Sequence, residues 1–182
     1  MSAPTTEIPG YTAGTWVIDG THSDVTFTVR HLGVSKVRGR FDQVETTIVT
    51  AENVTESTVT ATIKTTSVDT NNEQRDEHVR SADFLDVEQF PEMSFTSTAV
   101  RVEDGDFFID GELTLHGVTK PVTLNAELGG FGDGMAPGSK VLGVSATTEI
   151  SRTDFGVGAS IPGAVLGDKV KIELDIEAGL QA

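Results

Sequence analysis

The sequence predicts an all-β fold, an elongated eight-stranded antiparallel up-and-down barrel with one helical segment near residues 71–86 that covers a barrel end. Most of the chain alternates apolar and polar residues with a period of two, which is typical of half-buried strands. Several of these segments run about 10 to 12 residues, roughly twice the usual strand length. The stretch 71–95 departs from this alternation.

Eight alternating segments follow one another when the first, which bends at Gly20, is counted once. In the second segment the apolar face lies on odd-numbered residues up to Phe41 and on even-numbered residues from Val44. A bulge near Asp42 and Gln43 would place both sets on the same side of the strand. Turn signals join consecutive segments, so up-and-down closure is favoured over a two-sheet sandwich. The expected strands are residues 15–32, 37–50, 58–68, 93–102, 107–117, 118–131, 140–151 and 168–180.

The segment 71–86 has apolar residues at spacings of three and four and charged residues between them, which predicts an amphipathic helix of about three turns. Thr70 or Asn71 can cap its first turn, and Pro91 prevents its continuation. The residues expected to dock on the barrel end are Val79, Phe84 and Leu85.

Small residues alternate with Val, Ile, Leu and Phe on the inward faces, which suggests an apolar cavity rather than a filled core. The alternative is that they ease strand curvature. These small residues are Gly39, Ala61, Ala99, Gly111, Ala126, Gly143 and Ala146. The candidate lining residues are Phe27, Val29, Phe41, Ile48, Ile63, Phe84, Phe95, Leu113, Leu115, Leu124, Leu142, Val144, Ile172 and Leu174.

Composition excludes several classes of function. The formal net charge is −15, from 28 acidic and 13 basic residues, and such a surface disfavours nucleic-acid binding. The chain has no cysteine, so disulfides and thiolate chemistry are excluded. It has no apolar run long enough to span a membrane, no nucleophile elbow and no phosphate loop. We therefore expect no catalytic residue and no cofactor.

The four histidines form neither an HExxH nor an HxH pattern, and no metal site is expected. His31 lies on the same face of its strand as the apolar residues, and it is the best candidate to reach a ligand head group. Arg75 and His78 could do so from the helix, or they could pin the helix to the barrel rim. Pinning is the favoured interpretation.

The sequence predicts one barrel domain over residues 13–182, preceded by a flexible arm at 1–12. A secretory signal is not seen, so a cytoplasmic location is expected. A homodimer is a further expectation.

Four strings, at residues 16–41, 75–95, 111–122 and 151–156, resemble the motifs of the YceI-like family in order and spacing. The first is WVIDGTHSDVTFTVRHLGVSKVRGRF, and the second carries an R-D-x-H pattern at Arg75, Asp76 and His78. The later strings are GELTLHGVTKPV and SRTDFG. All four histidines fall inside these motifs.

This family comprises bacterial polyisoprenoid-binding proteins with a lipocalin-like barrel, many of them periplasmic. The resemblance implies binding, storage or transport of a polyisoprenoid, such as an isoprenoid quinone, or of a similar long-chain lipid. Two alternatives stay open. One is a barrel enzyme of the isomerase or metal-dependent type, acting on a small apolar substrate through His31, His78 or a metal. The other is a scaffold with a filled core.

Overall fold

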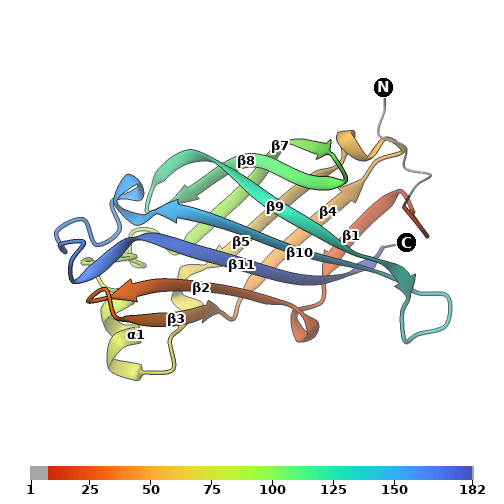
Figure 1. The fold of residues 1–182 in the computed structure, drawn as a ribbon. Coiled ribbons are helices and arrows are strands. Elements are labelled where there is room, and N and C mark those ends of the chain that lie inside the picture. Colours follow the sequence, from red (N-terminus) through yellow and green to blue (C-terminus); the bar gives the residue numbers. More distant parts are fainter. Residues whose placement is uncertain (1–7, 182) are drawn as a thin grey trace.

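Most of the chain forms antiparallel strands that belong to one sheet (Figure 1). The computed structural model describes residues 8–181, so the first seven residues of the predicted N-terminal arm lie outside the described residues. The strands are β1 (Gly14–Ile18), β2 (Asp24–His31), β3 (Ser35–Phe41), β4 (Val44–Thr50), β5 (Thr58–Lys64), β6 (Val68–Asp69), β7 (Glu92–Glu103), β8 (Asp106–Leu115), β9 (Val118–Asp133), β10 (Lys140–Ser151) and β11 (Leu166–Leu180).

Across residues 8–181 these strands make a closed barrel of eight, as predicted, because three expected strands are each divided in two. The 3₁₀ turn η2 (Gly20–His22) separates β1 from β2, and η4 (Thr65–Ser67) separates β5 from β6. The irregularity predicted at Asp42 and Gln43 is a break between β3 and β4. The two halves of each divided strand keep the same neighbours, except that β7 pairs with β5 and not with β6, so the up-and-down order is kept.

The barrel closes where β1 pairs with the last residues of β11. Trp16 lies opposite Leu180 in this pairing and opposite Ile48 on the β4 side. Its side chain is fully buried, and its indole Nε1 donates a 2.9 Å hydrogen bond to Thr50 Oγ1. The buried N–H is therefore satisfied at the seam.

The barrel is elongated because its strands are long. β9 has 16 residues and β11 has 15, which corresponds to about 50 Å of chain at ~3.3 Å per residue. Figure 1 shows both strands running nearly the whole length of the molecule. The predicted elongated barrel is confirmed.

The helix α1 (Glu73–Arg80) is shorter than the predicted segment 71–86, with 8 residues rather than three turns. Asn71 has a φ of 63°, and its neighbour Asn72 is the N-cap, accepting a 2.9 Å bond from Arg75 N–H. The expectation that Thr70 or Asn71 caps the helix was therefore wrong.

The helix ends early because Ser81 takes an extended conformation and its N–H and Oγ both donate to His78 O. The chain then continues in turns, and Asp86 has a φ of 49°. Leu85 is nevertheless buried in the core as predicted, with Val79 and Phe84 partly buried against it. The helix-to-strand connection thus packs on the barrel without being helical throughout.

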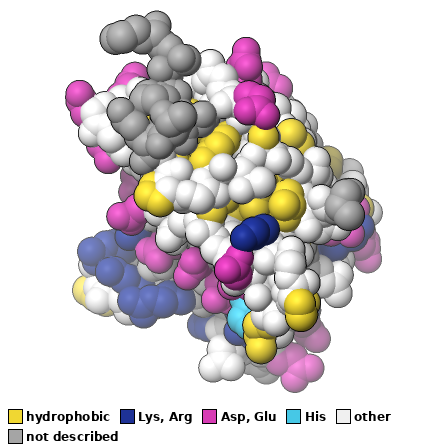
Figure 2. Space-filling model, turned by 90° about the vertical axis from the view of Figure 1, so that its right-hand side faces the viewer, with side chains coloured by type: hydrophobic (Ala, Val, Ile, Leu, Met, Phe, Trp, Pro, Cys, Tyr) yellow, Lys and Arg dark blue, Asp and Glu magenta, His cyan; other side chains and the backbone are white. Residues whose placement is uncertain are grey.

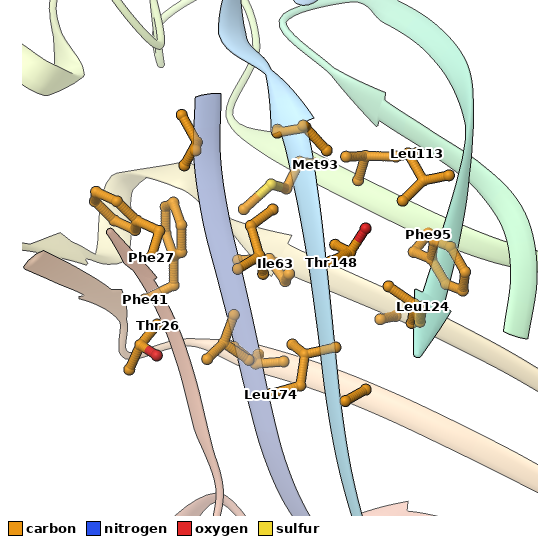
Figure 3. Close-up of a pocket in the computed structure, with 18 of the residues that line it drawn as sticks. Thr26, Phe27, Phe41, Ile63, Met93, Phe95, Leu113, Leu124, Thr148 and Leu174 are labelled. Carbon is orange, nitrogen blue, oxygen red and sulfur yellow. The ribbon is translucent and has the colours of Figure 1, made fainter. Parts of the chain in front are cut away.

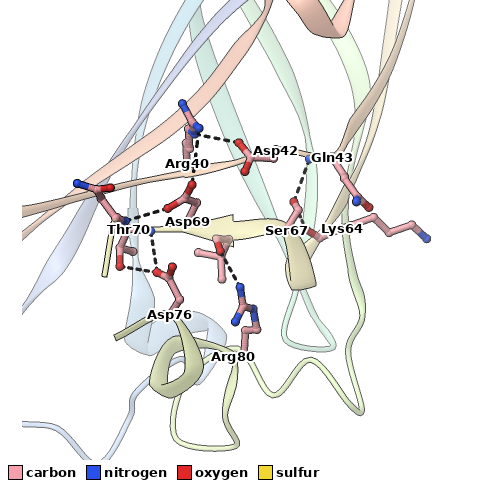
Figure 4. A network of polar contacts seen from close by, with 11 residues as sticks. Arg40, Asp42, Gln43, Lys64, Ser67, Asp69, Thr70, Asp76 and Arg80 are labelled. Carbon is pink, nitrogen blue, oxygen red and sulfur yellow. Dashed lines mark hydrogen bonds and ion pairs between the residues drawn. The ribbon is translucent and has the colours of Figure 1, made fainter. Parts of the chain in front are cut away.

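Polar contacts hold α1 to the barrel (Figure 4). The buried Asp76 carboxylate accepts from Thr70 N–H at 2.7 Å and from Thr70 Oγ1 at 2.5 Å. Arg80 donates to Thr66 O at 3.1 Å and to Val68 O at 3.2 Å. These bonds join both ends of the helix to the segment around β6, which pairs in turn with β3.

Two of the small inward residues, Gly39 and Gly111, do not border open space, because phenylalanine rings lie over them. Phe27 is opposite Gly39 in the β2–β3 ladder, and the Phe95 ring covers Gly111. Aromatic rings over strand glycines are a known device for stabilising curved sheets. Ala99 does not line the interior, because a bulge between Ser97 and Ala99 shifts the register of β7.

Replacing Gly111 with alanine tests this packing. The added Cβ would lie 2.6 Å from Thr96 O and closer still to the Phe95 ring, so overpacking should cost about 1–3 kcal/mol of unfolding free energy. Gly132→Ala on β9 is the matched control, because no atom lies within 4 Å of its added Cβ. Urea denaturation of both variants measures the difference, and equal stabilities would contradict the assignment.

Candidate ligand-binding cavity

A cavity of about 490 Å³ lies inside the barrel, within the ~300–1,000 Å³ typical of ligand pockets. Its wall is apolar because the inward residues of the long strands are Val, Ile, Leu, Phe and Met. Figure 3 shows Phe27 and Phe41 on one side of this space and Phe95, Leu113 and Leu124 on the other. The two former rings pack against each other with centroids 5.5 Å apart.

All the residues predicted as lining or head-group contacts lie on the wall of this one cavity. Their contact with a ligand stays a prediction. Ala61, Ala126 and Ala146 also line it, so part of the small-residue pattern does coincide with open space. Ten further wall residues were not predicted, although they lie on the same inward faces or follow a bulge: Val25, Met93, Val100, Phe107, Ile109, Val122, Leu128, Phe131, Ile150 and Ile176.

Several polar groups of the wall are already engaged within the protein. The Thr50 hydroxyl accepts from Trp16 and donates to Thr12 O at 2.7 Å. Thr148 Oγ1 donates to Thr123 O at 2.9 Å, and Thr70 Oγ1 donates to Asp76. Because a satisfied polar group gains little from a ligand, these positions favour an apolar occupant.

Arg75 and His78 reach the cavity at the α1 end, but their polar atoms are held by neighbouring residues. Arg75 donates through Nε to Thr70 Oγ1 at 2.9 Å and through Nη2 to Thr70 O at 2.6 Å. His78 Nε2 lies 3.1 Å from an Asp83 carboxylate oxygen, and its ring packs edge-on against Phe84. These are the contacts expected of residues that pin the helix.

The other three histidines lie apart. His31 lines the cavity and pairs with Leu166 across β2 and β11. His116 Nδ1 is 3.1 Å from Phe155 O.

His22 lies on the outer surface, where its Nδ1 is 2.8 Å from Asp19 Oδ2 and 3.4 Å from Glu177 Oε2. The bond between His22 and Asp19 lowers the pKa of the Asp19 carboxyl to about 2 and raises the pKa of the imidazole. The ligand atoms of these three residues lie within 4.8 Å of one another, and they are the candidate metal-holding group among residues 8–181. Their contacts are already those of an ion-paired cluster, and they lie outside the cavity.

Arg152 is a structural residue that sequence analysis missed. It is 3% exposed, lines the cavity, and directs its guanidinium into the loop that precedes β11. The signal was present in the SRTDFG string, but the string does not reveal burial. The backbone carbonyls that accept from Arg152 are those of Val157, Gly158, Ile161, Leu166 and Gly167.

A buried guanidinium is tolerated here because its donors are bonded to these carbonyls. Its fixed fork shapes the loop. Ile161 and Val165 of that loop, and Leu166 at the start of β11, line the cavity. Arg152 therefore forms one end of the cavity wall by positioning the backbone of other residues.

Arg152→Lys should lower the unfolding free energy by about 3 kcal/mol, because lysine cannot reach all five carbonyls and leaves buried acceptors unpaired. Arg80→Lys is the matched control, since Arg80 donates to two carbonyls and is only partly buried, and it should cost about 1 kcal/mol. Thermal or urea unfolding compares them. An Arg152→Lys variant with an unchanged unfolding free energy would show that the loop does not depend on the hydrogen bonds of the guanidinium.

Residues near the N-terminus line the opposite end. Tyr11 OH donates to Ala51 O at 2.6 Å, and its ring packs edge-on against Phe131 at 5.2 Å. Phe131 packs in turn on Trp16 at 5.4 Å. Ile8 is also a lining residue. Figure 2 views this end and shows hydrophobic side chains gathered in its middle.

A closed, elongated eight-stranded antiparallel barrel around an apolar cavity defines the class of lipocalin-like barrels, whose interior is wide enough for packed side chains or one small ligand. The profile of the YceI-like domain matches residues 16–178. The chain therefore belongs to the YceI-like family. Among residues 8–181, no helix has the length and apolarity needed to cross a membrane.

The relatives agree with this assignment. The chain is 46% identical over 140 residues to Protein YceI of Escherichia coli O17:K52:H18, covering 76% of this chain and 73% of that protein. The crystal structure of the Campylobacter jejuni YCEI protein superposes with a TM-score of 0.76 at 31% identity, covering 96% of this chain and 100% of that one.

A polyisoprenoid binding domain from Saccharophagus degradans, implicated in plant cell wall breakdown, has a TM-score of 0.67 at 17% identity, covering 93% and 100% of the two chains. At that identity the likeness concerns the fold.

Proposed function

We propose that this protein binds a polyisoprenoid or similar long-chain apolar lipid inside its barrel, for storage or transport, and catalyses no reaction on it. The observation that carries the proposal is the apolar cavity of about 490 Å³, several of whose polar lining groups are bonded within the protein. A ligand rich in hydrogen-bonding groups would find few partners along this wall.

Burial of apolar surface supplies the driving force. Each Å² of ligand surface removed from water contributes ~25 cal/mol, so a chain with a few hundred Å² of apolar surface gains several kcal/mol. The length of the barrel favours a thin, extended ligand over a compact one. Lining residues from both ends support this orientation, with Ile161 and Val165 at one end and Ile8 and Tyr11 at the other.

The relative from Saccharophagus degradans carries the description of a polyisoprenoid binding domain, and the shared fold supports the same ligand class here. The cation-bearing side chains at the cavity, Arg75 and Arg152, are held by backbone and threonine oxygens. An uncharged lipid therefore suits the wall better than a fatty acid, which would require an unpaired cation at the carboxylate.

Mass spectrometry of an organic extract of the purified protein tests the proposal. We expect a long-chain isoprenoid or comparable lipid at about one molecule per chain, absent from an extract of a control protein purified alongside. A protein that is free of lipid and takes up no all-trans polyprenol when supplied in detergent would contradict it.

Filling the cavity should abolish binding with little effect on folding. Ala146→Phe places a ring in the space that Ala146 now borders, so lipid occupancy should fall at least tenfold while the unfolding free energy changes by about 1–3 kcal/mol. Thr147→Phe is the matched control, because Thr147 is the next residue on β10 and is exposed. Full lipid occupancy in Ala146→Phe would show that the ligand lies elsewhere.

A further inference from the structure

An exposed apolar tip projects from the turn between β2 and β3. Leu32 is 55% exposed and Val34 is 84% exposed. Leu32 N–H donates a 2.9 Å bond to Val165 O, which brings the 42%-exposed Val165 beside them. We call Leu32, Val34 and Val165 the apolar tip. Clustered exposed apolar residues of this kind mark interaction sites.

Leu32 is not explained by the turn that holds it. Val34 N–H bonds to His31 O at 3.2 Å, and Leu32 and Gly33 have φ values of 55° and 70°. Two positive φ values at the central residues are those of a type I′ turn, whose central positions favour Asn, Asp or Gly. A leucine is disfavoured at that φ, and an exposed one recovers nothing by burial. The side chain therefore serves a purpose outside the fold.

Cations flank the apolar tip on the outer face of β11, β2 and β3. Arg30 lies directly opposite Lys36, Arg38 lies opposite Thr28, and Lys169 precedes Val170, the partner of Val29. All four basic residues are exposed, and none belongs to an ion pair among residues 8–181. We call Arg30, Lys36, Arg38 and Lys169 the basic flank.

The basic flank is unusual for this chain. The formal net charge is −15, with 28 acidic residues, yet these four of the 13 basic residues gather without acidic partners. Like charges directly opposite in a sheet, as at Arg30 and Lys36, destabilise it unless an external anion neutralises them. Figure 2 shows Lys and Arg side chains gathered on one flank, while acidic side chains are scattered over the rest of that view.

The apolar tip is next to the cavity. His31, at the end of β2, and Val165 and Leu166, at the start of β11, are lining residues. In Figure 1 the β2–β3 turn lies at the same end of the barrel as α1 and the loop before β11. A surface that contacts the apolar tip therefore lies next to the end of the barrel at which these lining residues reach the cavity.

We propose that the apolar tip and the basic flank dock this protein on the surface of a lipid bilayer that contains anionic lipids. Leu32, Val34 and Val165 enter the interfacial region, and the four cations meet lipid phosphates. The acidic remainder of the molecule is repelled by the same surface, which fixes the orientation with the α1 end of the barrel toward the membrane. Docking does not depend on the ligand of the cavity.

Flotation with two kinds of vesicle tests the proposal, one of phosphatidylglycerol and phosphatidylcholine and one of phosphatidylcholine alone. The full chain should float with the anionic vesicles, and the bound fraction should fall as salt is raised, because screening weakens the attraction of exposed charges. Arg38→Gln should weaken binding about fivefold. Leu32→Asn should weaken it by about tenfold or more, while its folding is unchanged or improved, since asparagine tolerates the left-handed conformation.

Two control variants should bind like the unaltered chain. Met135→Asn removes a fully exposed apolar side chain from the β9–β10 connection, at the opposite end of the barrel. Lys120→Gln removes an exposed cation from β9.

No flotation with anionic vesicles would overturn the proposal, as would flotation that Leu32→Asn and Arg38→Gln leave unchanged. A shift from dimer to monomer in Leu32→Asn, without vesicle binding by the unaltered chain, would assign the apolar tip to a second copy and overturn it equally. The lipid extract tests the cavity separately.

Discussion

The pairing of β1 with β11 is the constraint on which the rest of the structure depends. β1 is only five residues long, but it bonds β4 on one side and the end of β11 on the other. Because this seam closes the sheet, the inward faces of all the long strands converge on one interior. The buried Trp16, bonded to Thr50 and packed on Phe131, joins the seam to the end of the cavity.

Closure of the barrel explains why side chains fill only part of the interior and leave a cavity. Eight strands enclose more volume than the inward side chains occupy, and the rings of Phe27 and Phe95 are drawn down over Gly39 and Gly111. The ends are shaped by polar contacts rather than by packing alone. Arg152 organises the loop before β11, and α1 is bonded to the segment around β6. The proposed ligand site and docking surface both follow from this arrangement.

The barrel could be predicted because its strands carry a regular alternation of apolar and polar residues. Each strand needs an apolar inward face, so alternation alone located the strands and many of the residues that line the cavity. The length of α1 could not be predicted in this way, since the apolar spacing continues past Arg80 while Ser81 ends the helix by bonding to His78 O. The role of Arg152 was hidden because its acceptors are backbone carbonyls, which leave no mark in the sequence. The exposure of Leu32 likewise depends on turn geometry.

The central claim is that the closed barrel encloses a long apolar ligand along its axis. A crystal structure of the protein saturated with an all-trans polyprenol tests this most directly. We expect continuous ligand density inside the barrel, in contact with Phe27, Phe95 and Leu124, with the strands unmoved. An interior filled by rearranged side chains, with the polyprenol on the outer surface or absent, would contradict it.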